Sequence, residues 1–183
     1  DMYSSGFYPF PTPEHRWAYW SRHIMANRYD EPILPLYQDL RAILNGLVDT
    51  DYFVITTNVD HAFARNGFDE SLVFATQGDY GLWQCSVPCY AGTWSNESAV
   101  REMVERQRDL RIPSSLLPVC PRCKEPAAMN LRVDGTFVED EQWHDAAERY
   151  RRFLSEHESD RVLYLEIGVG WNTPSLIKFP FWQ

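Results

Sequence analysis

Tyr52-Phe53-Val54-Ile55-Thr56-Thr57-Asn58-Val59-Asp60 is the stretch of this 183-residue sequence that decides the fold. Residues 52–56 form a nearly continuous run of aromatic and β-branched side chains, which is typical of a strand buried on both faces of a parallel sheet. The polar residues after it then lie at the carboxyl edge of that sheet, where open α/β folds bind their ligands. The stretch therefore predicts both a fold class and the position of a site.

Helices are predicted on both sides of this strand, because apolar residues recur there at helical spacing. Their expected starts are Thr12-Pro13, Pro35, Asp60 and Asp140, and a further helix carries Val100. The helix from Asp60 should end at Gly67, a typical left-handed cap. In the helix from Pro35 we expect a buried apolar stripe, formed by Leu36, Leu40, Ile43, Leu44 and Leu47.

Two more strands are predicted, at residues 72–74 and 162–167. Strands that alternate with helices favour an α/β fold with a parallel sheet. Between these elements, cysteines and turns accumulate over residues 80–126, which we interpret as a small inserted module. The main domain would then comprise residues 1–79 and 127–183.

The four cysteines of the chain fall into two close pairs, Cys85 with Cys89 and Cys120 with Cys123. Zinc prefers four thiolate or imidazole ligands in a tetrahedron, and two tight turns that each present two sulfurs provide them. The spacing predicts a zinc ribbon whose closed site is structural. Two disulfides are the alternative, but they are disfavoured in an intracellular protein. A thioredoxin-type redox pair would leave two cysteines unexplained.

Polar and small residues follow each predicted strand at the ligand-binding edge. Thr57, Asn58 and Asp60 follow the first strand, Gln77 the second, and Gly168-Val169-Gly170 the third. Hydroxyl, amide and carboxylate groups can grip a ribose and a carboxamide, and glycines allow close approach of a backbone. Helix capping by Thr57 or Asn58 explains part of the pattern equally well.

Composition excludes several classes of function. The net charge of −9, with 17 basic and 26 acidic residues, disfavours a nucleic-acid partner, which needs concentrated positive charge. No apolar run reaches the roughly 18–20 residues of a membrane span. The first ten residues lack the pattern of a signal peptide. We expect a cytoplasmic protein without a membrane partner. Both ends look trimmed, which predicts a longer full-length chain.

Taken together, these motifs resemble the sirtuins. The resemblance rests on Thr56-Thr57-Asn58-Val59-Asp60-His61, on Gln77-Gly78-Asp79-Tyr80-Gly81 and on the cysteine pairs, in the family's order. Sirtuins normally carry His-Gly where this chain has Gln77-Gly78. With glutamine there, the chain is similar to the macrodomain-linked class M branch, whose members are protein ADP-ribosyltransferases. The family's opening strand and Gly-Ala-Gly phosphate loop have no counterpart in this sequence.

The resemblance implies a Rossmann-like, NAD-binding domain with helices on both faces of the sheet and an inserted zinc module. It implies that Asp60 holds the carboxamide of NAD, that Asn58 positions the ribose, and that Gln77 bonds the ribose hydroxyls. Thr57 and residues 168–170 complete the implied cofactor-binding set. The class M branch further implies mono-ADP-ribosylation of a lipoyl-carrier protein and a macrodomain hydrolase as functional partner.

The substitution at Gln77 bears on the choice of reaction. Deacylation needs a base to deprotonate a ribose hydroxyl, and glutamine cannot accept a proton at neutral pH, whereas histidine can. Transfer of ADP-ribose to a protein acceptor is therefore the predicted activity. A deacylase is the first alternative and needs His61 or another group as its base. A non-catalytic NAD-binding or interaction module is the second. The sirtuin resemblance also makes Arg132 and Asp134 candidate acceptor contacts, and solvated loop charges explain them equally well.

Overall fold

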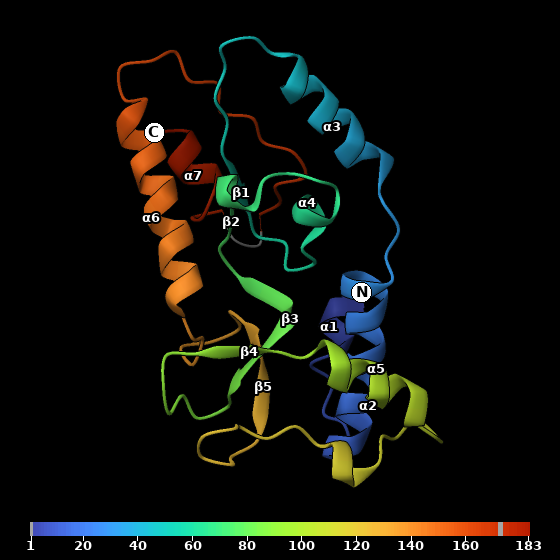
Figure 1. The fold of residues 1–183 in the computed structure, drawn as a ribbon. Coiled ribbons are helices and arrows are strands. Elements are labelled where there is room, and N and C mark those ends of the chain that lie inside the picture. Colours follow the sequence, from blue (N-terminus) through green and yellow to red (C-terminus); the bar gives the residue numbers. More distant parts are fainter. Residues whose placement is uncertain (1, 172–173) are drawn as a thin grey trace.

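The structure is a computed structural model that describes residues 2–171 and 174–183. Two separate sheets organise it: a parallel pair, β1–β2, and a three-stranded antiparallel sheet in the order β4-β3-β5. Figure 1 shows the antiparallel sheet in the lower part of the molecule and the parallel pair above it, with β3 leading from one part to the other.

The parallel pair consists of β1 (Val54–Thr56) and β2 (Val73–Ala75), with Val54 opposite Val73. The connection between them contains α4 (Ala62–Arg65) and a short 3₁₀ turn, η2 (Glu70–Leu72). A long helix, α6 (Glu141–Glu156), packs against β2, and begins after Asp140, whose side chain accepts a hydrogen bond from the backbone N–H of Trp143. The predicted strand at 52–56, the strand near 73 and the helix after Asp140 are confirmed.

The predicted third strand, residues 162–167, is wrong. This segment is irregular, and four of its side chains are largely exposed: Leu163 at 85%, Leu165 at 60%, Ile167 at 53% and Tyr164 at 48%. A parallel strand is stabilised by ladder hydrogen bonds and by burial of both faces. The segment pairs with neither β1 nor β2 in the described chain, so an apolar run alone does not make it a strand.

The helix predicted from Pro35 is present as α3 (Pro35–Gly46), but its apolar stripe is not buried. Leu36 is 65% exposed, Ile43 63% and Leu47 49%. Figure 1 shows why, because α3 stands away from the parallel pair instead of lying on its face. Helical periodicity correctly predicted the helix, and the prediction of burial was wrong.

The antiparallel sheet comprises β3 (Gly78–Cys85), β4 (Thr93–Ser95) and β5 (Ala127–Leu131). Two helices, α2 (Pro13–Ile24) and α5 (Glu97–Arg106), pack with it around the larger of two apolar cores. Trp20, Ile24, Val100 and Met103 are at most 1% exposed in this core. The helices predicted from Thr12-Pro13 and around Val100 are thus confirmed.

Four short elements complete the described chain. They are α1 (Met2–Ser5), the π-helical turn η1 (Met25–Tyr29) that continues α2, the 3₁₀ turn η3 (Ser114–Leu116), and α7 (Lys178–Phe181). Among the described residues, no helix has the length and apolar character needed to cross a membrane.

The predicted fold class, a mixed α/β structure with a parallel sheet and a four-cysteine module, is confirmed. The boundaries placed at 79/80 and 126/127 stay a prediction. The antiparallel sheet runs across both of them, because β3 (Gly78–Cys85) begins before the first and its partner β5 (Ala127–Leu131) lies beyond the second.

Candidate active site and metal centre

A cavity of about 460 Å³ opens where β1 and β2 end and β3 begins. Asn58, Asp60 and His61 reach it from the segment after β1, and Asp79 from the start of β3. Trp143 and Arg149 of α6 line another part of its wall. The two polar segments predicted to meet at the sheet edge do meet there, although Thr57 and Gln77 do not line the cavity.

Asp60 is held by the turn into α4. Its Oδ1 accepts a hydrogen bond of 2.9 Å from the backbone N–H of Ala62. Desolvation by burial raises the pKa of Asp60, and the neighbouring Glu31 carboxylate raises it further, against lowering by Arg65 and by the Ala62 hydrogen bond. A carboxylate accepts hydrogen bonds from the N–H groups of an amide, and a protonated carboxyl can also donate to the amide oxygen. Asp60 can therefore make the predicted contact with a carboxamide.

Asn58 is exposed at the mouth of the cavity, and its backbone N–H donates to Oγ1 of Thr56 at 3.0 Å. Neither Thr57 nor Asn58 caps α4, because the residue before this helix is His61. The capping interpretation of these two residues is therefore wrong. The Asn58 side chain instead hydrogen-bonds with the Tyr37 hydroxyl, beside the cavity that Asn58 lines.

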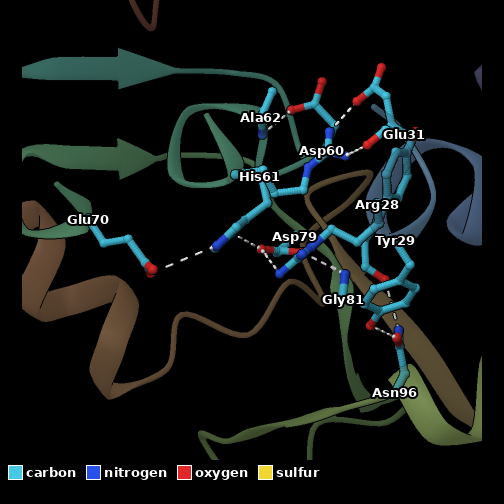
Figure 2. A network of polar contacts seen from close by, with 12 residues as sticks. Arg28, Tyr29, Glu31, Asp60, His61, Ala62, Glu70, Asp79, Gly81 and Asn96 are labelled. Carbon is cyan, nitrogen blue, oxygen red and sulfur yellow. Dashed lines mark hydrogen bonds and ion pairs between the residues drawn. The ribbon is translucent and has the colours of Figure 1, made fainter. Parts of the chain in front are cut away.

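Asp79 is the centre of a charged network that the sequence did not predict (Figure 2). Its Oδ1 accepts hydrogen bonds from Nε of Arg28 at 2.7 Å and from the backbone N–H of Gly81 at 2.6 Å. Its Oδ2 accepts one from Nδ1 of His61 at 2.8 Å. Burial raises the pKa of Asp79, but the hydrogen bond from His61 and the Arg28 guanidinium lower it by more, so the carboxylate is ionised.

His61 lies before α4, not within it as predicted. Its backbone is left-handed, with φ of 60°, a region that histidine enters more often than most residues with a Cβ. Nε2 of the ring lies 3.8 Å from the Glu70 carboxylate, and the ring lines the cavity. His61 was weighed in the sequence because it follows Asp60, whereas Arg28 gave no signal, since it lies 51 positions from Asp79.

Gln77 lies next to the cavity-lining Gly78 but does not itself line the cavity. Its Nε2 is buried and has no hydrogen-bond partner among the described residues. An unpaired buried amide costs free energy, which a ligand acceptor would recover. This orphaned donor is the feature at Gln77 that fits a bound ribose.

Residues 168–170 lie in an irregular segment and do not line the cavity. Gly168 has φ of 65°, a conformation that favours glycine, but a Cβ built at Gly168 or Gly170 would meet no atom within 4 Å. No close backbone approach within the described chain explains these glycines. Their cofactor-binding role stays a prediction, together with that of Val169.

The candidate acceptor contacts have other partners. Asp134 accepts hydrogen bonds from the backbone N–H and Oγ1 of Thr136, which closes a local turn. The Arg132 guanidinium lies 4.3 Å from the ring centre of Phe137 and pairs with Glu139. Both residues are exposed, so either side chain can be reached by an acceptor protein.

The four cysteines converge at the end of β3 distal to the cavity. All are free thiols, and their sulfurs lie within 4.8 Å of one another. Cys85 and Cys123 are separated by 3.5 Å between sulfurs, and Cys89 and Cys120 by 3.7 Å. A zinc–sulfur bond of about 2.3 Å places the sulfurs of a tetrahedral site about 3.8 Å apart, so this donor set fits a closed metal site.

The overall fold is that of a sirtuin. A Sir2 homologue in complex with NAD matches 92% of this chain and 58% of its own chain, with a TM-score of 0.53 and 16% identity. The ADP-ribose complex of a mutant Sir2 homologue matches 92% of this chain and 59% of its own, with a TM-score of 0.52 and 15% identity. The resemblance inferred from the sequence motifs is confirmed at the level of the fold.

Two curated relatives are similar to this chain in sequence, and both are named as ADP-ribosyltransferases. The protein ADP-ribosyltransferase of Staphylococcus aureus is 40% identical over 182 residues, which are 99% of this chain and 57% of the relative. The probable bifunctional ADP-ribose hydrolase/ADP-ribosyltransferase of Fusarium oxysporum f. sp. cubense is 28% identical over 184 residues, 96% of this chain and 30% of the relative. The chain thus spans only part of either relative. No protein-family model matches it.

Proposed function

We propose that this protein is an NAD-dependent protein mono-ADP-ribosyltransferase of the sirtuin type. The observation that carries the proposal is the 40% identity to a protein ADP-ribosyltransferase across 99% of this chain. The cavity supports it, because Asn58 and Asp60 face the same space and Gln77 keeps a buried donor without a partner. NAD supplies the scissile bond between nicotinamide and ribose when it is bound.

In this proposal each predicted site residue, whether it lines the cavity or not, has its own role in the reaction. Asp60 orients the nicotinamide carboxamide, Asn58 positions the ribose, and the Gln77 amide donates to a ribose hydroxyl. Thr57 and residues 168–170 complete the contacts with the cofactor. Fixed polar groups of this kind hold the reacting atoms in one geometry and favour the charge that develops on the ribose. Gln77 binds but accepts no proton, which favours transfer over deacylation.

The metal of the cysteine site, in this proposal, is Zn²⁺. The four sulfurs form a set of soft donors in tetrahedral spacing, which zinc prefers. None of the four cysteines lines the cavity, so zinc would stabilise the antiparallel half and take no part in the reaction.

The proposed acceptor is a lipoylated carrier protein, and the proposed functional partner is a macrodomain hydrolase that removes ADP-ribose. The acceptor follows from the class M resemblance. The hydrolase is supported by the fungal relative, whose name combines an ADP-ribose hydrolase with an ADP-ribosyltransferase. A cytoplasmic location remains part of the proposal.

The test is to incubate the full-length protein with NAD labelled in its ADP-ribose part and with lipoylated or unlipoylated carrier protein. Free nicotinamide and label on the carrier are followed together. We expect label on the lipoylated carrier, and a loss of about 100-fold or more in Asn58→Ala, as for other groups that position a reacting centre. Asn45→Ala on α3, outside the cavity, is the matched control and should keep full activity.

Other outcomes separate the alternatives. Nicotinamide release without label on the carrier would keep the cofactor and reject the acceptor. Removal of an acyl group from an acylated peptide, in place of label transfer, would establish the deacylase. If NAD binds without being cleaved, or does not bind at all, the enzyme proposal fails and an interaction module takes its place.

A further inference from the structure

We infer that His61, oriented by Asp79, is the general base that deprotonates the protein acceptor during ADP-ribosyl transfer. This inference rests on the proposed function. The acceptor nucleophile must lose a proton during transfer, so the reaction needs a base, and the amide side chain of Gln77 cannot accept that proton. The cavity offers one imidazole among its lining residues, and that imidazole is His61.

The orientation of His61 is set by its carboxylate partner. The ionised Asp79 accepts hydrogen bonds only, so Nδ1 of His61 at 2.8 Å carries the proton and Nε2 is left as the acceptor. A carboxylate that fixes the tautomer of a histidine is the arrangement used by general-base histidines in hydrolases. Asp79 acts through His61 and is therefore a positioning residue.

Asp79 is itself fixed from the opposite side. Nε of Arg28 and the backbone N–H of Gly81 both donate to its Oδ1. Its Oδ2 accepts from Nδ1 of His61 at 2.8 Å and, more weakly, from Nη2 of Arg28 at 3.5 Å. A Cβ at residue 81 would come within 3.0 Å of both Arg28 Nε and Asp79 Oδ1, which explains the glycine there. The carboxylate is held before any ligand arrives, as a preorganised site requires.

The backbone of His61 also points to this role. Its φ of 60° lies in the left-handed region, which strains a residue with a Cβ, and such strain persists where the surroundings enforce it, commonly at functional sites. The ring is 30% exposed and lies between Asp79 and Glu70, as Figure 2 shows. Glu70, 3.8 Å from Nε2, would stabilise the positive charge that the ring gains with a proton.

The step balances as follows. The acceptor, a hydroxyl, thiol or amine of the protein substrate, gives its proton to Nε2 of His61 while its heteroatom bonds to the anomeric carbon of the ribose. The bond from that carbon to nicotinamide breaks, and its electron pair leaves on nicotinamide as the neutral base. His61 then releases the proton to water.

The decisive variant is His61→Gly, because glycine adopts the left-handed backbone without strain and leaves space for free imidazole. We expect the transfer rate to fall by about 100-fold or more, within the range of general bases, and added imidazole to restore part of it. NAD affinity should change less than about threefold. His144→Gln, at an exposed histidine of α6, is the control and should show neither loss nor rescue.

A second measurement needs no NAD. The ¹⁵N chemical shifts of the His61 ring report which nitrogen carries the proton, and we expect the Nδ1–H tautomer in the wild type and a mixture in Asp79→Asn. The inference is overturned if the wild type transfers ADP-ribose but His61→Gly does so at an unchanged rate. It is also overturned if the loss is not rescued by imidazole and the tautomer is Nε2–H. If the wild type itself transfers nothing, the proposed function fails instead.

Discussion

The half of the molecule built on β3, β4 and β5 buries its large apolar side chains, whereas the half built on β1 and β2 leaves many of them exposed. Trp20, Ile24 and Met103 of the first half are at most 1% exposed. Among the described residues of the second half, Phe74, Ala146 and Ala147 form a small buried apolar cluster, and Leu163 is 85% exposed. The first half contains the larger apolar core and the four cysteines of the proposed metal site, and the second presents the edge where NAD is proposed to bind.

The apolar core and the proposed site thus lie in different halves of the molecule. β3 joins the two, because its first residues carry Asp79 to the cavity and its last residue is Cys85 of the metal site. A rigid strand can thus hold the charged network at one end while the sulfurs fix the other. Changes in the antiparallel half should cost folding free energy, and changes near β1 should cost activity.

The largest expected effect on stability is that of the metal site. Cys120→Ser removes a buried ligand, and metal binding of this kind is a major part of the folding free energy of small metal modules. We expect a loss of about 4 kcal/mol or more, which lowers Tm by about 10 °C or more. Thermal unfolding followed by near-ultraviolet circular dichroism, beside zinc content, measures this.

The control for that variant is Arg122→Ser, a non-ligand in the same turn. It should keep its zinc and a nearly unchanged Tm. If Cys120→Ser also kept the wild-type Tm, the metal site would be irrelevant to the stability of the antiparallel half.

The next prediction compares the loss of stability when an isoleucine is replaced by alanine in each half. Ile24→Ala empties a fully buried position at the end of α2 and should cost about 2–5 kcal/mol, the usual range for isoleucine in a core. Ile43→Ala on α3, where the side chain is 63% exposed, should cost less than about 0.5 kcal/mol. Urea unfolding measures both. Similar costs at the two positions would show that α3 is covered in solution.

A smaller effect is expected from two glycines. A Cβ at Gly6 would lie 2.2 Å from the ring of Trp20, so Gly6→Ala forces the packed indole to shift at a cost of about 1–3 kcal/mol. A Cβ at Gly135 would meet no atom within 4 Å, and Gly135→Ala should leave stability unchanged or slightly raised. Equal unfolding midpoints for the two variants would contradict the packing of residue 6 on α2.

The smallest expected effects are changes in stability of opposite sign at two carboxyl groups, Asp79 and Asp60. The pKa of Asp79 is lowered in the folded state, so its stabilisation is present above its ordinary value and is lost as pH falls through the lowered value. The pKa of Asp60 is raised by burial, so its ionised form opposes folding at neutral pH. At pH 7, Asp79→Asn should lower the urea midpoint and Asp60→Asn should raise it slightly while weakening NAD binding. Shifts of the same sign would refute the assignment.

Much of the site could be predicted because it is local in sequence. The run at 52–60 contains both the strand and the polar groups that follow it. Each pair of cysteines is close enough in sequence for one tight turn to bring its two sulfurs together. Arg28 and Asp79 could not be predicted, because their contact joins residues 51 positions apart through tertiary packing. Periodicity likewise indicated an apolar face on α3 and an apolar run at 162–167, but a pattern does not say what covers an apolar surface.

The most direct test of the central claim, that NAD binds at the edge after β1, is hydrogen–deuterium exchange of the full-length protein with and without NAD. We predict slower exchange in peptides that cover residues 54–61 and 76–81, and unchanged exchange around Cys85 and Cys120. Asn58→Ala should abolish this protection, and Asn45→Ala should preserve it. Protection confined to other segments, or none at saturating NAD, would contradict the account.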